Sequence, residues 1–318
     1  MAQTKETMAL RHRLLLIRHF GAPTGGNVKV RDYYLHAAAH PSIDAAVWFS
    51  PGSRHLESDI WDGVAGAAIV GDPRADLADA RFVALNGKDW SLLPERASRP
   101  EILHFTQHPG YLTDPVLRGY LARPARRICT TPALLDALAP AAGGPMHLVP
   151  IGAADGFFAR RSDSKSIGVT ILSGKQPALA EALAERLRRR GLAPVLAGAP
   201  RLPQTTYEAL IGATDVLVAL PNVVEGFYLP ALEGMAAGSV VVTNDAGGNR
   251  GHCRAEATCL LVPRDDLDAH EAAVMRALSD APLRHRLRAG GDAVASGHTM
   301  AEERRAFHAM LDVALAER

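Results

Sequence analysis

The sequence predicts an α/β protein with two doubly wound, parallel-sheet domains. Three observations predict this class. Short apolar runs without polar alternation recur along the chain, as is typical of strands buried on both faces. They alternate with longer segments of helical composition, as in a βαβ series. The 318 residues also exceed the usual size of one hydrophobic core, which favours two domains.

The first domain is expected over residues 1–151. Its candidate strands are 14–20, 45–50, 66–71, 81–85, 101–107, 126–130 and 146–152. A glycine-rich loop at 21–27 leads into a helix at 28–40, and a second helix is expected at 132–140. The polar, aperiodic segment 152–166 predicts an interdomain linker.

The second domain is expected over residues 167–300. Its candidate strands are 167–174, 193–198, 215–221, 239–244 and 259–266, and its first helices are 177–191 and 205–213. A further short helix should begin at Pro230, because proline suits the first helical position. It should end at Gly238, because helices commonly stop at a residue with positive φ.

Composition excludes several classes of protein. Hydrophobic residues make up 47% and charged residues 22%, which is typical of a globular protein. A net charge of +1 argues against a nucleic-acid surface. No apolar run approaches 18 residues, and the start of the chain resembles a first strand more than a signal peptide. We therefore expect a cytoplasmic protein whose three cysteines are buried thiols.

Two carboxylates, Glu225 and Glu233, flank the most informative segment. They lie eight residues apart, across the loop Gly226, Phe227, Tyr228 and Leu229 and into the following helix. In parallel sheets, ligands bind beyond the carboxyl ends of the strands, where the N–H groups of a helix N-terminus attract anions. Glu233 has a simpler interpretation too, as an acid in the first turn that complements the helix dipole.

This segment resembles the donor-binding motif of retaining glycosyltransferases of the GT-B class (group 1, family 4-like), in which seven residues separate two glutamates. The resemblance implies two Rossmann-like domains facing a central cleft. It assigns the donor sugar to Glu225 and the nucleotide ribose to Glu233. Tyr228 departs from the family, which usually has glycine there, and its side chain would narrow the phosphate pocket or change the sugar accepted. The last helix, within 301–318, is expected to pack back on the first domain.

Other segments extend the resemblance. Gly174 and Lys175 follow a strand where the family places a glycine and a cation near the diphosphate, although the family's second cation is missing from 176–179. Gly198 ends another strand and is expected to face the base or ribose. Gly25 and Gly26 resemble the family's N-terminal cleft loop.

His108, which follows a strand, is the candidate polar residue near the donor sugar, although a histidine before Pro109 also suits a turn. His104 is expected on the buried face of that strand. The arginines of 186–190 have two interpretations as well, a solvated helix end or a peripheral membrane contact.

The implied activity is metal-independent hexosyl transfer from a nucleotide-diphosphate sugar to an acceptor glycan, lipid or small molecule. No cofactor is expected beyond that donor, and no metal-binding motif is present. Catalysis would involve Glu225, His108 and Lys175, and the partners would include no nucleic acid and at most a peripheral membrane contact. A nucleotide-sugar epimerase of the same fold and an inactive nucleotide-sugar-binding protein are the alternatives. A two-domain solute-binding protein would normally carry an export signal.

Overall fold

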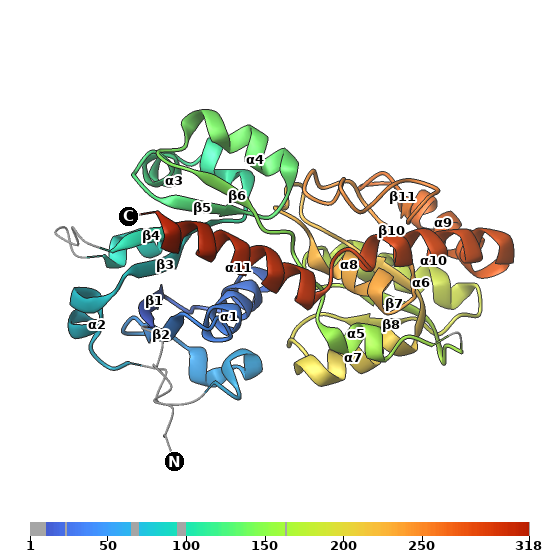
Figure 1. Ribbon diagram of the computed structural model, residues 1–318. Helices are drawn as coiled ribbons and strands as arrows, with labels where there is room; N and C mark the ends of the chain where they lie inside the picture. The colour runs from blue at the N-terminus through green and yellow to red at the C-terminus, as the bar shows by residue number, and fades with distance from the viewer. Residues whose placement is uncertain (1–10, 23, 65–69, 94–99, 163, 318) are drawn as a thin grey trace, which may run out of the picture.

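The computed structural model describes residues 11–317, apart from 23, 65–69, 94–99 and 163. Two α/β units lie side by side, and the chain crosses between them twice (Figure 1). The first unit holds strands β1–β6, and the second holds β7–β11. The predicted α/β class is therefore confirmed, with one parallel sheet in each half of the chain.

The first sheet is parallel in all its pairings and has the order β2-β1-β3-β4-β5-β6. Its strands are β1 (His12–Arg18), β2 (Ile43–Phe49), β3 (Phe82–Asn86), β4 (Glu101–Thr106), β5 (Arg126–Cys129) and β6 (Met146–Leu148). Leu15 of β1 is in register with Ala46 on one side and Val83 on the other. The four consecutive apolar residues 14–17 are all buried, because helices cover both faces of the sheet.

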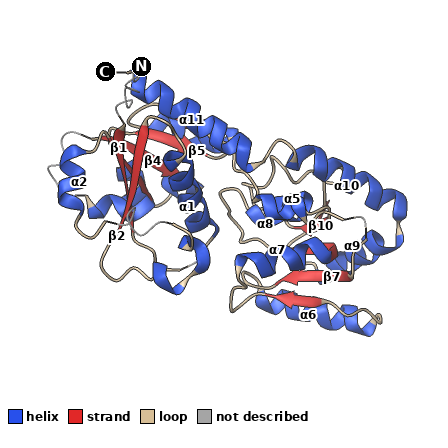
Figure 2. Ribbon diagram, turned by 60° about the horizontal axis from the view of Figure 1, so that its bottom comes forward, coloured by secondary structure: helices blue, strands red, loops and turns tan. Residues whose placement is uncertain are grey.

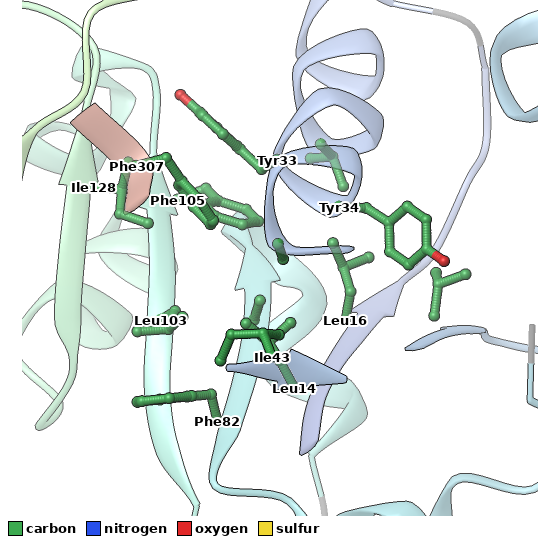
Figure 3. Packing of buried hydrophobic residues seen from close by; sticks show 14 of the residues in the cluster. Leu14, Leu16, Tyr33, Tyr34, Ile43, Phe82, Leu103, Phe105, Ile128 and Phe307 are labelled. Carbon is green, nitrogen blue, oxygen red and sulfur yellow. The ribbon is translucent and has the colours of Figure 1, made fainter. Parts of the chain in front are cut away.

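The helices of this unit are α1 (Gly25–Ala38), α2 (Pro73–Asp79), α3 (Pro115–Leu121) and α4 (Pro132–Leu138), with short 3-10 turns at His55–Glu57, Asp59–Trp61, Gly87–Leu92, Pro109–Leu112 and Ala139–Ala141. Figure 3 shows the core between α1 and the sheet. The ring of Tyr33 lies 4.7 Å from that of Phe105 on β4 and 5.3 Å from that of Phe307, measured between centroids. Phe307 comes from the last helix, α11 (Met300–Ala316), so the end of the chain completes the first core.

The second sheet has the order β11-β10-β9-β7-β8. Its strands are β7 (Ile167–Leu172), β8 (Val195–Ala197), β9 (Thr214–Ala219), β10 (Val240–Thr243) and β11 (Leu260–Leu261). Its helices are α5 (Asp155–Ala159), α6 (Pro177–Arg189), α7 (Gln204–Ala213), α8 (Leu229–Ala236), α9 (Leu267–Ser279) and α10 (Ala281–Ala295). Gly238 follows α8 with φ of +78°, as its role as a stop requires.

The two crossings of the chain lie side by side. The N–H of Ala153 donates to the carbonyl of His298 at 2.8 Å, and Ala153 forms a parallel bridge with Thr299. From there α11 runs along the first unit and packs on α1 (Figure 2). The expectation of an irregular linker over 152–166 needs correction, because α5 lies within it and buries Phe157 in the second core.

Three further expectations need correction. The loop predicted at 21–27 ends early, since Thr24 caps α1 and places Gly25 and Gly26 in its first turn. Pro230 is the second residue of α8, which begins at Leu229. The strand predicted at 259–266 pairs only over two residues, because Pro263 cannot donate to the sheet. The strand predicted at 66–71 falls mostly outside the described residues.

Candidate active site

A cleft of about 760 Å³ lies between the two units. Residues at or just after the ends of β3, β4, β7 and β8 line it, so the carboxyl ends of both sheets open into one space. In each sheet the first strand lies between the next two strands of the chain, which makes a switch point at β1–β3 and another at β7–β9. Ligands of doubly wound sheets bind at such points.

Lys175 and Glu225 meet at the second switch point. The Lys175 Nζ lies 2.5 Å from Glu225 Oε1, which also accepts from the N–H of Asn222 at 2.8 Å. The backbone of Glu225 is fixed as well, because its N–H donates to the carbonyl of Ala246 at 3.0 Å. A cation and a carboxylate are thus paired at the edge of the cleft, next to the loop that opens α8.

Tyr228 occupies the N-cap position of α8, and its backbone adopts a left-handed conformation, with φ of 69° and ψ of 70°. Side chains other than glycine seldom adopt it, since Cβ then crowds the backbone. The ring is buried, and Lys175 Nζ lies 5.0 Å from its centre, within the range of a cation–π contact. Burial also raises the pKa of the Tyr228 phenol well above its ordinary value. Tyr228 therefore covers Lys175 from one side of the cleft.

Glu233 lies on α8 and lines the cleft. Its Oε2 accepts from the hydroxyl of Tyr207 on α7 at 3.1 Å. Desolvation raises the pKa of Glu233 to about 7, although the Tyr207 hydrogen bond and the charges of Lys29 and Arg201 act in the opposite direction. A carboxyl that is half protonated near neutral pH is therefore available to a ligand hydroxyl.

The loop between the two glutamates brings the units into contact. A Cβ on Gly226 would lie only 1.7 Å from the carbonyl oxygen of Gln107, which belongs to the first unit. Phe227 is buried, and its ring stacks on His252 with centroids 4.5 Å apart. Leu229, at the start of α8, lies against Gly25 of the opposite unit. The cleft is therefore closed at its base.

His108 follows β4, is exposed and lines the cleft. Its Nδ1 accepts from the N–H of Gly110 at 2.9 Å, which leaves Nε2 for a ligand. His104 is fully buried, as expected, and its Nε2 lies 2.9 Å from the hydroxyl of Tyr111. Burial lowers the pKa of His104 to about 3, so it stays neutral and supports the wall of the cleft.

The predicted glycines Gly25, Gly26, Gly174 and Gly198 all line the cleft. Gly174 has open space around it, whereas a Cβ on Gly198 would meet the Ser173 hydroxyl at 2.2 Å. The structure therefore brings every predicted site residue to one cavity.

The sequence also placed Lys29 and Gln107 near the ligand, and both line the cleft. Sequence reasoning missed other polar residues of the cleft, among them Arg201 and Tyr207. Arg201 follows β8 and pairs with Asp59 of the first unit at 3.3 Å. A single arginine in a loop carries no pattern, and only its place after a strand end could have indicated it.

Within the described residues, no group of three or more His, Cys, Asp or Glu side chains is placed to hold a metal ion. The described helices also include none that is long and apolar enough to cross a membrane. The three cysteines are free and buried, as predicted.

Comparisons with solved structures identify the fold. Sucrose-phosphate synthase from Thermosynechococcus elongatus superposes with a TM-score of 0.69 at 16% identity, over 97% of this chain and 100% of that one. Anabaena HepE in complex with UDP and glucose gives 0.72 at 14%, over 95% and 100%. A glycosyltransferase from Rickettsia africae gives 0.70 at 11%, over 97% and 100%. Comparison with curated protein sequences finds no significant match.

The two facing α/β units and the cleft between them are the GT-B fold of glycosyltransferases. The family described as "Glycosyl transferases group 1" matches residues 169–293, a range that contains Lys175, Glu225 and Glu233. The match covers most of the second domain, and the fold of the whole chain is that of the GT-B glycosyltransferases.

Proposed function

We propose that this enzyme transfers a sugar, with retention of anomeric configuration and without a metal ion, from a nucleotide-diphosphate sugar to an acceptor hydroxyl. The observation that carries the proposal is the Lys175–Glu225 pair, set at the β7–β9 switch point in the same cleft as Glu233. HepE, whose fold is shared, has been solved with UDP and with UDP-glucose, which supports a donor of this class.

Different residues of the site would bind three parts of the donor, namely the sugar, the ribose and the diphosphate. Glu225 would accept hydrogen bonds from sugar hydroxyls, and Glu233 from the ribose. Lys175 and the N–H groups at the start of α8 would face the diphosphate, because a cation and a helix N-terminus both stabilise negative charge. His108, from the other domain, would contact the sugar through Nε2. No cofactor other than the donor is needed for these contacts.

In the proposed reaction, the bond between the sugar C1 and the phosphate oxygen breaks as the acceptor oxygen bonds to C1 on the same face. The proton of the acceptor hydroxyl passes to the departing diphosphate. Negative charge grows on the diphosphate during this step, and Lys175 is placed to stabilise it. For this to happen Lys175 must exchange part of its contact with Glu225 for the phosphate.

Two observations favour a second candidate, a protein that binds a nucleotide sugar without turning it over. Tyr228 fills space beside Lys175, and Lys175 is already paired with Glu225. Both features would reduce access of a diphosphate to the cation. An inactive protein would bind the donor and release no nucleotide.

A panel of nucleotide sugars, incubated with the protein and assayed for released nucleoside diphosphate, tests the proposal. We expect one donor to be consumed, and the rate to be unchanged by EDTA. Binding of a donor without release would establish the second candidate. Loss of release in EDTA, restored by magnesium, would refute metal independence. The anomeric proton coupling of the product, measured by NMR, tests retention.

A further inference from the structure

Lys29 is a buried cation at the wall of the cleft, and none of the donor contacts proposed above uses it. It lies on α1, is only 2% exposed and belongs to the residues that line the cavity. Its Nζ lies 2.6 Å from Glu303 Oε2, 2.8 Å from Asp32 Oδ2 and 2.9 Å from the carbonyl oxygen of Gly152. An ammonium has three N–H donors, so these partners leave none for a phosphate. The role of Lys29 is therefore different from that of Lys175.

The partners of Lys29 lie on both crossings of the chain between the domains. Gly152 belongs to the first crossing, and Glu303 lies in the first turn of α11, directly after the second. Glu303 is 0% exposed, and its Oε2 also accepts from the N–H of Gly152 at 3.2 Å. A Cβ on Gly152 would lie 2.6 Å from the carbonyl oxygen of Thr299, so no side chain separates the crossings. Lys29 and Glu303 thus fasten both crossings to α1.

The crossings also contact the donor loop of the second domain. The Nδ1 of His298, on the second crossing, donates to the carbonyl oxygen of Ile151 on the first at 2.7 Å. The ring of His298 lies 5.6 Å from that of Phe227, measured between centroids. Phe227 is buried and belongs to the loop between the two glutamates of the donor site. A continuous series of contacts therefore joins α1 of the first domain to this loop.

The charge of Lys29 provides a second link to the donor site. Desolvation raises the pKa of Glu233 to about 7, and the charge of Glu208 also raises it. The charges of Lys29 and Arg201 and the hydrogen bond from Tyr207 lower it. A nearby cation favours the ionised carboxylate, so loss of the Lys29 ammonium would raise the pKa of Glu233 further.

We propose that Lys29 and Glu303 are positioning residues for the donor site. They hold the two crossings against α1 and thereby fix Phe227 and the loop around it, although neither residue touches the donor. The inference rests on the proposed function, because it gives the order of this loop a purpose in donor binding. It adds two residues of the first core to those on which donor affinity depends.

Amide hydrogen exchange of the full chain, measured by mass spectrometry without any ligand, tests the structural link. Glu303→Gln removes the charge of the carboxylate and keeps an amide oxygen in its place. Glu302→Gln is the matched control, because Glu302 is the preceding residue of α11 and pairs with the exposed Arg305. Strand β9, in the core of the second domain, reports any global loss of stability.

A double variant, Lys29→Met with Glu303→Gln, removes both charges together. It keeps the chain foldable, because Asp32 retains Arg31, whose Nη2 lies 2.7 Å from Asp32 Oδ1. Removal of one partner alone from a buried ion pair is more destabilising than removal of both. The double variant also removes the ammonium, which Glu303→Gln retains.

We expect the amides of residues 225–229 to exchange severalfold faster in Glu303→Gln and in the double variant than in the parent protein. Exchange in this loop should be unchanged in Glu302→Gln, and exchange in β9 should be unchanged in all three. Parent-like exchange of the loop in both Glu303 variants would overturn the inference. An equal increase in β9 would do so too, because it would show a general loss of stability.

Calorimetric titration with UDP, between pH 6 and pH 8, tests the effect on binding. We expect the affinity of Glu303→Gln for UDP to fall severalfold, and equal affinity in the parent protein would overturn the inference. The midpoint of the pH dependence should lie higher in the double variant than in Glu303→Gln, because only the double variant lacks the ammonium. Coincident midpoints would overturn the electrostatic link. Faster exchange of the loop, with no binding of UDP, GDP or ADP by the parent protein, would refute the proposed function instead.

Discussion

Tyr228 combines a left-handed backbone conformation with a side chain that contacts Lys175 in the candidate site. A glycine would adopt its left-handed conformation without steric cost, whereas a tyrosine pays about 1–2 kcal/mol. Burial of the ring in the second core offsets this cost. The sequence predicted that the side chain would narrow the phosphate pocket or change the sugar accepted. It could not predict the contact with Lys175, because that depends on the φ and ψ of a single residue.

For Tyr228→Gly we expect a net loss of stability of about 1–3 kcal/mol. Removal of the buried ring costs more than relief of the strained backbone returns. At the same time Lys175 becomes more accessible, so nucleotide release should be at least as fast as in the parent protein. Chemical unfolding and the release assay measure the two effects. Greater stability together with slower release would contradict this account.

Glu233 should make stability and nucleotide binding depend on pH. The pKa of Glu233 is 4.5 in the unfolded chain and about 7 in the folded protein. Between pH 4.5 and pH 7 the folded protein therefore binds a proton at Glu233 that the unfolded chain has lost. Its contribution to stability is present below about pH 4.5 and is lost as pH rises to about 7.

The ionised carboxylate is the better acceptor for ribose hydroxyls. The affinity for the nucleoside diphosphate should therefore increase from pH 6 to pH 8, by up to about tenfold. Calorimetric titrations of the parent protein and of Glu233→Gln check this, since the amide does not titrate. The same pH dependence in the variant would assign it to another group.

Elements differ in how far the sequence predicts them. Strands such as β1 and β9 were predicted because each contains four consecutive apolar residues, 14–17 and 216–219, that are buried on both faces of the sheet. α5 was missed, since five residues are too few to show a helical period. Its place is set by Phe157, which packs in the second core, and a single buried aromatic does not distinguish a helix from a loop.

One contact between elements links the domains beside the cleft. Asp59, in a 3-10 turn of the first domain, accepts from the N–H of Gln204 at 2.7 Å and pairs with Arg201. α7 has no side-chain cap of its own, so Asp59 caps it from the opposite domain. The loop that carries Arg201, between β8 and α7, is thereby held over the cleft.

A double-mutant cycle on Asp59→Ala and Arg201→Ala should give a coupling free energy of about 0.5 kcal/mol, because both side chains are about one-third exposed. Asp59→Ala alone should cost about 1 kcal/mol through loss of the cap. The Asp59→Ala substitution should also weaken nucleotide binding, although Asp59 itself does not contact the ligand. Urea unfolding and calorimetry give these values, and strictly additive effects would show that the pair is not coupled.

At the scale of the whole molecule, the two domains contact each other at the base of the cleft. The backbone at Gly226 touches Gln107, and α11 returns to complete the first core. The expected fold class could be predicted because it follows from alternating strands and helices. The contact between the domains could not, since it joins segments more than 100 residues apart in the sequence.

Gly226→Ala should force the domains apart, because its Cβ would lie within 1.7 Å of a backbone oxygen. We expect a larger radius of gyration in solution scattering and slower nucleotide release. Gly251→Ala is the matched control, since its Cβ would meet no atom within 4 Å. If both variants scatter alike and keep full activity, the closed contact at Gly226 is not needed for function.

The most direct test of the account is the rate of nucleoside diphosphate release by the parent protein and by Glu225→Ala, with the donor found in the panel. Loss of a charged hydrogen bond costs about 1.5–3 kcal/mol, and more when the bond strengthens in the transition state. We predict that Glu225→Ala melts at nearly the parent temperature and releases nucleotide at least about tenfold more slowly. Release at the parent rate by the folded variant would contradict the central claim that Glu225 holds the donor sugar.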